Sequence, residues 1–442
     1  MILSRAARLR AKALSRRVTR MAYLSPMPPA KTGIATYSRS VLAGLRRTGF
    51  ASRNDIDVLW PMKRRYEATL PWYDIGIYHL GNNVEFHRDI YRQCIQTPGL
   101  VVLHDVALDD FVRGMLAVGD PLGFAAHREA LRLKNLMTSR DAISNEPLRV
   151  PWCAHAVRRS RGVIVHSEFG RRYLEEFGCK TPVFVVPHPP VQSEAALRRA
   201  EAAAPRFRAE MPRDAVVVGV FGDLNGSRGI EAVLEAAGTI GAETPVHVQL
   251  VGRRIEGYDV DSVVERSGRA GITTLATDVE DPEFLARMMA TDIVVNLRYP
   301  YWGEVSGSLA NALQTGRATD VSATGTYLDL PDDVVRRIEG GPPRASELVR
   351  VVGALAADEA LRNALGARAR EHVRELARAD ATARGYERAI TETLALLKDP
   401  ARQALARWAG ALLDIGVSEE AMHEGFGLSY MQALSTFARS VR

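Results

Sequence analysis

The stretch DIVVNLRYPYWGEVSGSLANALQTG, residues 292–316, decides the fold that we expect for this chain. Its apolar start, Ile293–Leu297, predicts a buried parallel strand. A loop that carries Glu304 follows, and then a helix from about Ser306 to a glycine stop at Gly316. In open α/β sheets, ligands bind where a strand's carboxyl end meets a helix amino end, and the free N–H groups there favour anions. An ordinary βα turn capped by serine has the same pattern, so the rest of the chain must decide between the two.

Length and composition indicate a globular protein of more than one domain. The 442 residues exceed what one core holds and predict two or three domains, and 46% apolar with 25% charged residues is ordinary. The formal charge is +6, but seven basic residues and no acidic one lie in residues 1–20. The remainder of the chain is close to neutral, which argues against nucleic-acid binding by that part.

Cysteine use and hydropathy predict a cytoplasmic protein. The cysteines are odd in number and lack metal-site spacing; they are Cys94, Cys153 and Cys179. This is typical of a reducing compartment without disulfides. No apolar run reaches the ~18–20 residues that span a bilayer, and the first residues do not have the form of a secretory signal.

The leader, residues 1–20, is a basic amphipathic stretch. One helical stripe is apolar and the remainder is arginine-rich; the stripe is Leu3, Ala7, Ala11, Leu14, Val18 and Met21. Such a helix predicts peripheral contact with an anionic membrane, here the inner face of the plasma membrane. The alternative is an extension without a role, with Met21 as the true start.

Strand and helix patterns alternate along most of the chain. Strands are predicted at 21–24, 55–60, 74–80, 100–104, 162–166 and 183–186, and again at 216–221, 246–251, 272–275, 293–297 and 318–322. Helices are predicted at 35–45, 121–139, 168–177, 229–239, 281–289, 306–315, 344–355 and 358–374. This alternation predicts two Rossmann-like halves with doubly wound parallel sheets, and a ligand cleft between them.

The expected domains follow these series. They are the leader 1–20, an acceptor-side domain 21–200, a nucleotide-sugar domain 201–377, a closing helix 378–398 and a helical tail 399–442. The Ala- and Arg-rich segment 194–210 is predicted to be a solvent-facing helix. EGFGL, at 424–428, looks like a sugar-binding signature, but it lacks a preceding buried strand and is interpreted as chance.

Polar side chains cluster where the predicted strands end. In the first half they follow four strands; they are Lys31–Gly33, His79 with Asn82 and Asn83, His104 with Asp105, and His166 with Ser167. In the second half they are Gly222–Arg228, Gly252–Arg254, Asp278 and Arg298–Ser308. A single histidine at a strand end is usually structural, but three on one sheet edge favour a ligand site.

Together these segments resemble a family 4 retaining glycosyltransferase with the GT-B fold. The resemblance covers about residues 21–398, outside the leader and tail. It rests on the order of SPMPPAKTGIATYS, YDIGIYHLGNN, GLVVLHD, VIVHSEFGRRYL, VFVVPHP, VFGDLNGSRGIEAVLEA, HVQLVG, LRYPYWGEVSGSL and YLDLPDD. A group of bacterial transferases has a similar GExSGSL form of the paired-glutamate motif.

The resemblance implies roles for individual residues. Glu304 matches the glutamate that receives donor-sugar hydroxyls, and a carboxylate accepts two such hydrogen bonds. Ser306, Gly307 and Ser308 match the backbone cradle of the sugar and diphosphate. Arg228 matches the basic residue that holds the diphosphate.

The resemblance also implies that the first half of the chain forms the opposite wall of the ligand cleft. Gly33 should abut the diphosphate, and His104 should lie beside the anomeric centre, hydrogen-bonded to a sugar hydroxyl or the departing phosphate. We also place Gly222 and Arg253 on the donor side. We assign four residues to the acceptor or sugar side: His79, Asn82, Asp105 and His166.

Two positions depart from the family pattern. The second glutamate, which holds the ribose, is replaced by Ala312. An arginine expected before the diphosphate-binding residue appears as Asp223, and Arg253 or Arg254 could compensate. These changes bear on nucleotide recognition more than on sugar transfer.

The resulting prediction is a hexosyltransferase of polysaccharide or glycoconjugate biosynthesis. It would use a UDP- or GDP-linked sugar as co-substrate, a saccharide or lipid-linked acceptor, and neither metal nor other cofactor. The sequence leaves the sugar, base, acceptor, linkage and oligomeric state undetermined. Two alternatives stay open: a non-catalytic nucleotide-sugar-binding or scaffold subunit of a polysaccharide assembly complex, and a sugar-nucleotide epimerase of the same architecture.

Overall fold

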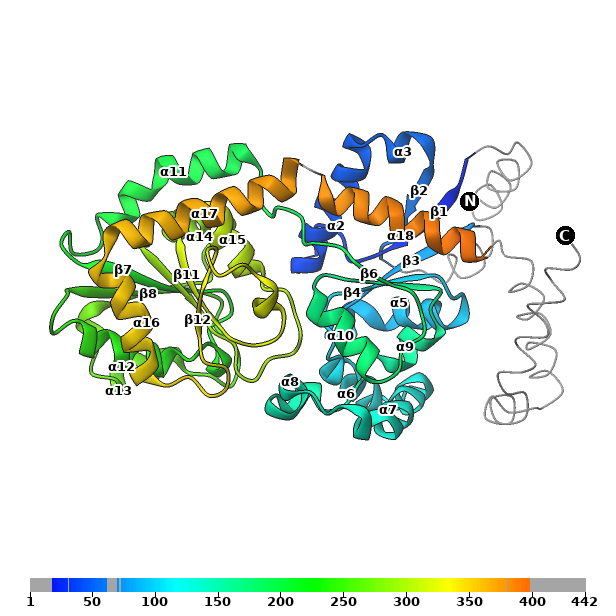
Figure 1. The fold of residues 1–442 in the computed structure, drawn as a ribbon, viewed down its shortest axis with the longest axis horizontal. Helices are drawn as coiled ribbons and strands as arrows, with labels where there is room; N and C mark the ends of the chain where they lie inside the picture. The colour runs from blue at the N-terminus through cyan, green and yellow to red at the C-terminus, as the bar shows by residue number, and fades with distance from the viewer. Residues whose placement is uncertain (1–17, 31, 62–69, 71–72, 379, 398–442) are drawn as a thin grey trace, which may run out of the picture.

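The chain forms two lobes, each built on a six-stranded parallel sheet (Figure 1). The computed structural model describes residues 18–30, 32–61, 70, 73–378 and 380–397. The tail 399–442, with its EGFGL segment, and the leader up to residue 17 lie outside the described residues, as does Lys31. In the described part, no helix combines the length and the apolar character needed to cross a bilayer.

The first lobe carries a sheet in the order β2-β1-β3-β4-β5-β6. Its strands are β1 (Arg20–Leu24), β2 (Asp55–Val58), β3 (Ile75–Leu80), β4 (Leu100–Leu103), β5 (Gly162–Val165) and β6 (Val183–Val185). All six match predicted strands within a few residues. Buried apolar clusters cover both faces of this sheet, which explains why central strands such as β4 and β5 are continuous apolar runs.

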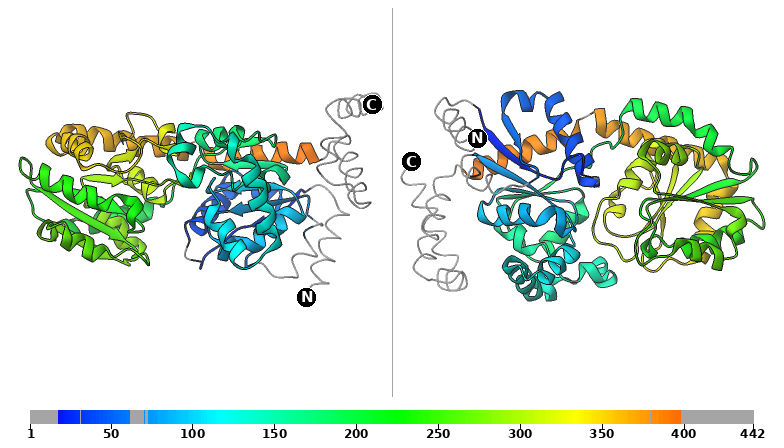
Figure 2. Two further views of the ribbon diagram at one scale, coloured as in Figure 1. Left: turned by 90° about the horizontal axis from the view of Figure 1, so that it is seen from below. Right: turned by 180° about the vertical axis from the view of Figure 1, so that it is seen from behind.

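Helices pack on both faces of that sheet (Figures 1 and 2). They are α2 (Gly33–Arg47), α3 (Phe50–Arg53), α5 (Val84–Gln96), α6 (Asp109–Ala117), α7 (Pro121–Leu133), α8 (Arg140–Ser144), α9 (Ala154–Arg159) and α10 (Glu168–Glu176). The single helix predicted at 121–139 ends at Leu133 and continues as the 3₁₀ turn Lys134–Leu136.

The second lobe carries a sheet in the order β12-β11-β10-β7-β8-β9. Its strands are β7 (Val216–Phe221), β8 (Val246–Gly252), β9 (Thr273–Thr277), β10 (Ile293–Asn296), β11 (Ala318–Ser322) and β12 (Arg336–Ile338). Strand order reverses between β7 and β10, so the loops after these two strands diverge and leave a crevice at the sheet's carboxyl edge. The prediction lacked β12.

The second lobe also follows a doubly wound plan. Its helices are α11 (Glu194–Arg208), α12 (Ile230–Ile240), α13 (Val260–Arg266), α14 (Asp281–Met289), α15 (Gly307–Thr315), α16 (Ala345–Ala357) and α17 (Glu359–Arg378), with 3₁₀ turns η4 (Gly226–Arg228), η5 (Ala270–Ile272) and η6 (Gly325–Asp329). Helix α15 begins and ends as the sequence predicts, capped by Ser306 and stopped by Gly316 at φ 72°.

The solvent-facing prediction for 194–210 is wrong for one side of α11. Leu197, Ala200, Ala204 and Phe207 are buried and form a cluster with α14 residues such as Leu285. They recur every three or four residues, which places them on one helical face, while arginines occupy the other. The high content of alanine and arginine hid this stripe.

The chain passes between the lobes twice, once before α11 and once between α17 and α18 (Ala381–Leu397) (Figure 1). Helix α18 packs on the first lobe, where the hydroxyls of Tyr37 and Tyr386 lie 3.0 Å apart and Thr48 donates to Glu387. Helix α18 is therefore part of the first lobe's core.

The loop after β10 contacts the first lobe directly. The Ala107 N–H donates to the carbonyl of Trp302 at 3.1 Å, and the Tyr301 N–H donates to Oδ1 of Asn145 at 3.0 Å. Gly303 has φ 81°, and a Cβ there would overlap Val106. A glycine is thus required at this position for the two lobes to approach.

Candidate functional site

Two buried arginines lie at the crevice where the second sheet reverses its strand order. Arg228 ends η4, after β7, and Arg298 follows β10; each is 8% exposed or less. Both guanidiniums donate to Oδ1 of Asn296, Arg228 at 3.0 Å and Arg298 at 3.2 Å. The last residue of β10 thus brings the two side chains together.

Arg228 is held at the amino end of α15. Its Nη1 lies 3.3 Å from Oγ of Ser308, and its Nε donates to the Asp223 carbonyl at 3.1 Å. Gly222, at φ 107°, leaves the space that the guanidinium fills, since a Cβ there would collide with it. No carboxylate forms an ion pair with Arg228 within the described residues.

Arg298 connects the α15 cap to Glu304. Its Nε donates to Oε1 of Glu304 at 3.0 Å, and its Nη2 donates to Oγ of Ser306 at 3.1 Å. The backbone N–H of Trp302 donates to the other carboxylate oxygen at 3.1 Å. Glu304 is therefore fixed in orientation while its side chain stays 20% exposed.

The electrostatics of this group favour an anion. Burial, and then the charge of Arg298, lowers the pKa of Arg228 to about 9. Two guanidiniums face one carboxylate, and the helix amino end adds partial positive charge. A phosphate at this place would supply the missing counter-charge, which is worth most where water is excluded.

A cleft of about 300 Å³ joins this group to the first lobe. Gly33, His104, Asp105 and His166 from the first lobe line it opposite Glu304 and Gly307 from the second. The structure therefore brings predicted residues from both halves around one cavity. Arg228, Ser306 and Ser308 lie beside it at the base of α15.

Asp105 is the carboxyl group that faces Glu304 across the cleft. Its Oδ2 accepts a hydrogen bond from the Asn82 N–H at 2.9 Å. Burial, and then the negative charge of Glu304, raises the pKa of Asp105 to about 7. Asp105 can therefore exchange a proton near neutral pH, which its sequence context did not reveal.

Three histidines form a chain of imidazoles, of which His104 and His166 line the cleft and His79 lies behind them. His166 Nδ1 donates to the Val186 carbonyl at 3.1 Å, so its Nε2 accepts from His104 Nδ1 at 3.3 Å. His104 Nε2 then accepts from His79 Nδ1 at 3.0 Å. Burial lowers the pKa of all three groups, so the chain is neutral.

The hydrogen bonds among the three histidines limit the expected role of His104 as a ligand contact. Both of its ring nitrogens are engaged by His79 and His166, so a ligand contact requires exchange of one of these bonds. His79 is fully buried and lies behind His104, away from the lining of the cleft. One backbone carbonyl fixes all three tautomers, a relation that strand-end position alone does not predict.

Several predicted residues have other contacts. The Asn82 amide nitrogen donates to Asp109 and Asp110 at 3.2 and 3.1 Å, and its oxygen accepts from the Phe111 N–H in the first turn of α6 at 3.0 Å. Arg253 is exposed and forms a bidentate pair with Asp223, at 2.9 and 3.1 Å. Asp223 thus holds a guanidinium at the carboxyl ends of β7 and β8.

Arg254 and Ala312 lie farther from the cleft. Arg254 pairs with Asp261 on α13. Ala312 is fully buried in an apolar cluster with Phe221 and Val251. Neither offers a polar group to the cavity.

Sequence analysis missed several polar residues of the site. Asp281 and Asn311 line the cleft, Asn296 joins the two arginines, and Tyr327 lies close to both of them. Asn296 lies next to the end of the strand predicted at 293–297, and that position near the carboxyl edge was the available signal. Among the described residues, no group of three His, Cys, Asp or Glu side chains could hold a metal ion.

Comparison with known proteins identifies the fold. No family model matches the sequence, and no curated protein matches it. A sucrose-phosphate synthase from Thermosynechococcus elongatus superposes with TM-score 0.55 at 16% identity, over 88% of this chain and 100% of that one. HepE from Anabaena, in complex with UDP and glucose, gives 0.55 at 14%, over 85% and 99%.

A third structure supports the same conclusion. A glycosyltransferase from Rickettsia africae superposes with TM-score 0.50 at 10% identity, over 87% of this chain and 100% of that one. These likenesses and the two parallel sheets confirm the predicted two-domain GT-B fold.

Proposed function

We propose that this chain is a retaining glycosyltransferase, similar to family 4, that transfers a hexose from a UDP- or GDP-linked sugar. The acceptor would be a hydroxyl of a saccharide or lipid-linked glycan in polysaccharide or glycoconjugate synthesis. One observation carries this proposal: Arg228 and Arg298 are buried together at the amino end of α15, beside the cleft-facing carboxylate of Glu304.

The geometry supports separate binding positions for the diphosphate and for the sugar. The diphosphate would lie against Arg228 and the α15 amino end, with Ser306, Gly307 and Ser308 in contact. The sugar hydroxyls would bind Glu304, whose orientation Arg298 and Trp302 already fix. Fixed positive charge at the leaving phosphate stabilises the transition state without reorganisation.

In this mechanism the anomeric carbon breaks its bond to the β-phosphate oxygen and bonds the acceptor oxygen on the same face. The acceptor proton passes to the leaving phosphate. HepE was solved with UDP and glucose, which supports a nucleotide sugar as donor here. Gly33 would approach the diphosphate, and His104, Asp105 and His166 would contact the sugar or acceptor.

A direct experiment is to incubate the protein with radiolabelled UDP- and GDP-hexoses and a glycan extract. We expect transfer by the wild type and a loss of about 100-fold or more in Glu304→Gln, the range for removing one preorganised group. Glu231→Gln, on the solvent side of α12, is the matched control. Transfer at the wild-type rate by Glu304→Gln would overturn the assignment of this residue.

The alternative is a binding or scaffold subunit, and buried Ala312 is the observation that favours it. Nucleotide-dependent thermal stabilisation without transfer from any donor would support that alternative. A shift with UDP but not with GDP or ADP would identify the base.

A further inference from the structure

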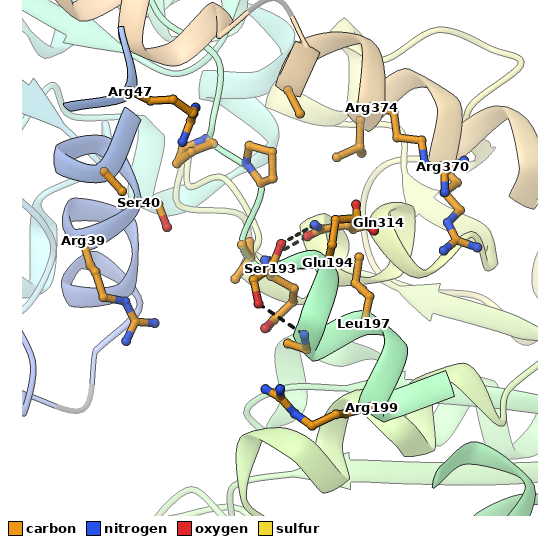
Figure 3. Close-up of a pocket in the computed structure, with 18 residues that line it drawn as sticks. Arg39, Ser40, Arg47, Ser193, Glu194, Leu197, Arg199, Gln314, Arg370 and Arg374 are labelled. Atoms are coloured by element: carbon orange, nitrogen blue, oxygen red, sulfur yellow. Dashed lines mark hydrogen bonds between the residues drawn. The ribbon is translucent and has the colours of Figure 1, made fainter. Parts of the chain in front are cut away.

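A second cavity of about 770 Å³ opens where the two lobes join, next to the cleft (Figure 3). Its walls come from α2, the segment before α11, the start of α11, the end of α15 and α17. Ser40 and Gln192 line both this cavity and the cleft, so the two adjoin. The volume lies within the range of about 300–1,000 Å³ for small-molecule sites.

The floor of this cavity is fixed. The Gln192 N–H donates to Oε1 of Gln314 at 3.0 Å, and Gln314 Nε2 donates back to the Gln192 carbonyl at 2.7 Å. Gln192 Nε2 also donates to Oδ1 of Asn311 at 3.1 Å. These bonds tie the connecting segment to α15, and Figure 3 shows those of Gln314 between the opposing arginines.

Five arginines line the walls and one carboxylate accompanies them. Figure 3 shows Arg39 and Arg47 on α2, Arg199 on α11, and Arg370 and Arg374 on α17 at the opposite side. The carboxylate, Glu194, lies in the first turn of α11. The lining therefore carries a large positive excess.

Most of this charge has no counter-ion. Arg47 pairs with Asp380 at 2.6 Å, but Arg39, Arg199, Arg370 and Arg374 form no ion pair within the described residues. Elsewhere, arginines on helix surfaces commonly have partners, as Arg171 does with Glu168 and Glu175. Unpaired guanidiniums gathered in one concave site favour anion binding.

Arg370 gives the strongest indication of a ligand. Its stem packs within 3.4 Å of the position that a Cβ on Gly316 would take, and its buried Nε has no hydrogen-bond partner in the described structure. Its charge also acts with burial to lower the pKa of Arg317. An anion beside this guanidinium would offset the repulsion between the two arginines.

We propose that this cavity binds a small ligand carrying two or more phosphate groups, held between α2 and α17. Phosphate matches the planar fork of arginine, and cations on opposite walls require more than one anionic group. The amino end of the 15-residue helix α11 adds its partial positive charge. This site is distinct from the pair Arg228 and Arg298, which lies at the base of α15.

The test is calorimetric titration of the full chain with inorganic tripolyphosphate. The variant R39Q/R374Q removes two exposed cavity arginines and should weaken binding at least tenfold. The control R46Q/R378Q removes two exposed arginines from the same helices outside the cavity and should change binding less than twofold. Equal weakening in both variants, unchanged binding in R39Q/R374Q, or no saturable binding by the wild type would each overturn the proposal.

Two further probes identify the source of the phosphates. Pyrophosphate binding that is lost in R39Q/R374Q and matched by farnesyl diphosphate in detergent would indicate a free phosphate ligand. Binding of farnesyl diphosphate at least tenfold tighter than pyrophosphate, and lost in the same variant, would indicate a lipid-linked one.

Discussion

The substitution Asp105→Asn is expected to change how the stability of the protein depends on pH. The pKa of Asp105 is raised to about 7 by burial and by Glu304. In the unfolded chain the carboxyl group ionises near its usual pKa of about 4. Between these two values the folded state holds a proton that the unfolded state releases, so the free energy of unfolding falls as pH rises and levels off above about 7.

The expected magnitude follows from the size of the shift. One pKa unit corresponds to about 1.4 kcal/mol, so a shift of about three units gives an upper bound of about 4 kcal/mol. Asp105 lines an open cleft, and water there screens part of the penalty, so we expect about 1–3 kcal/mol. The asparagine side chain in the variant does not ionise, so Asp105→Asn should gain this amount relative to wild type above about pH 7.

Urea unfolding followed by far-UV circular dichroism, at several values from about pH 4 to pH 8.5, measures this difference. The wild type should lose stability relative to Asp105→Asn as pH rises through the window. Asp214→Asn, an exposed carboxylate in a loop before β7, is the control and should show no such trend. A difference between Asp105→Asn and wild type that does not vary with pH would refute the reasoning.

Two further substitutions test packing. Gly303→Ala should destabilise the protein by about 2–4 kcal/mol, because the strain of a positive φ and the overlap with the first lobe add together. Gly257 has a similar φ but open space around it, so Gly257→Ala should lose only about 1 kcal/mol. Equal losses of the two variants in urea unfolding would contradict the close approach of the lobes at Gly303. Phe207→Ala should lose about 3–5 kcal/mol if α11 is buried as described, and a loss below about 1 kcal/mol would show that this face of α11 is exposed.

The sheets could be predicted because their strands are buried on both faces. Continuous apolar runs such as Leu100–Leu103 identify such strands without any knowledge of neighbours. Strand β12, with the sequence RRI, has no such run, and its pairing with β11 depends on the assembled sheet. Helix α5, which the prediction does not name, has a regular buried face with Ile90, Tyr91 and Cys94, so the same pattern could have identified it.

The location of the candidate site could be predicted from the sequence, but most of its side-chain contacts could not. Glu304 and Arg228 follow strands whose carboxyl ends meet at the reversal of strand order, and that position was visible in the sequence. The link between His79 and His104 depends on the register of β3 with β4, which pairs His79 with Val102. Such a register is a property of the assembled sheet, and local sequence does not contain it.

The loop after β10 makes the position of Glu304 depend on contact between the lobes. Trp302 donates its N–H to the Glu304 carboxylate while its carbonyl accepts from Ala107 of the first lobe. The neighbouring Tyr301 N–H is bound by Asn145, also of the first lobe. Separation of the lobes would break these two bonds and leave Arg298 as the side chain that still orients Glu304. We therefore propose that closure of the lobes helps to orient the Glu304 carboxylate, which would keep the proposed site incomplete until water has been excluded.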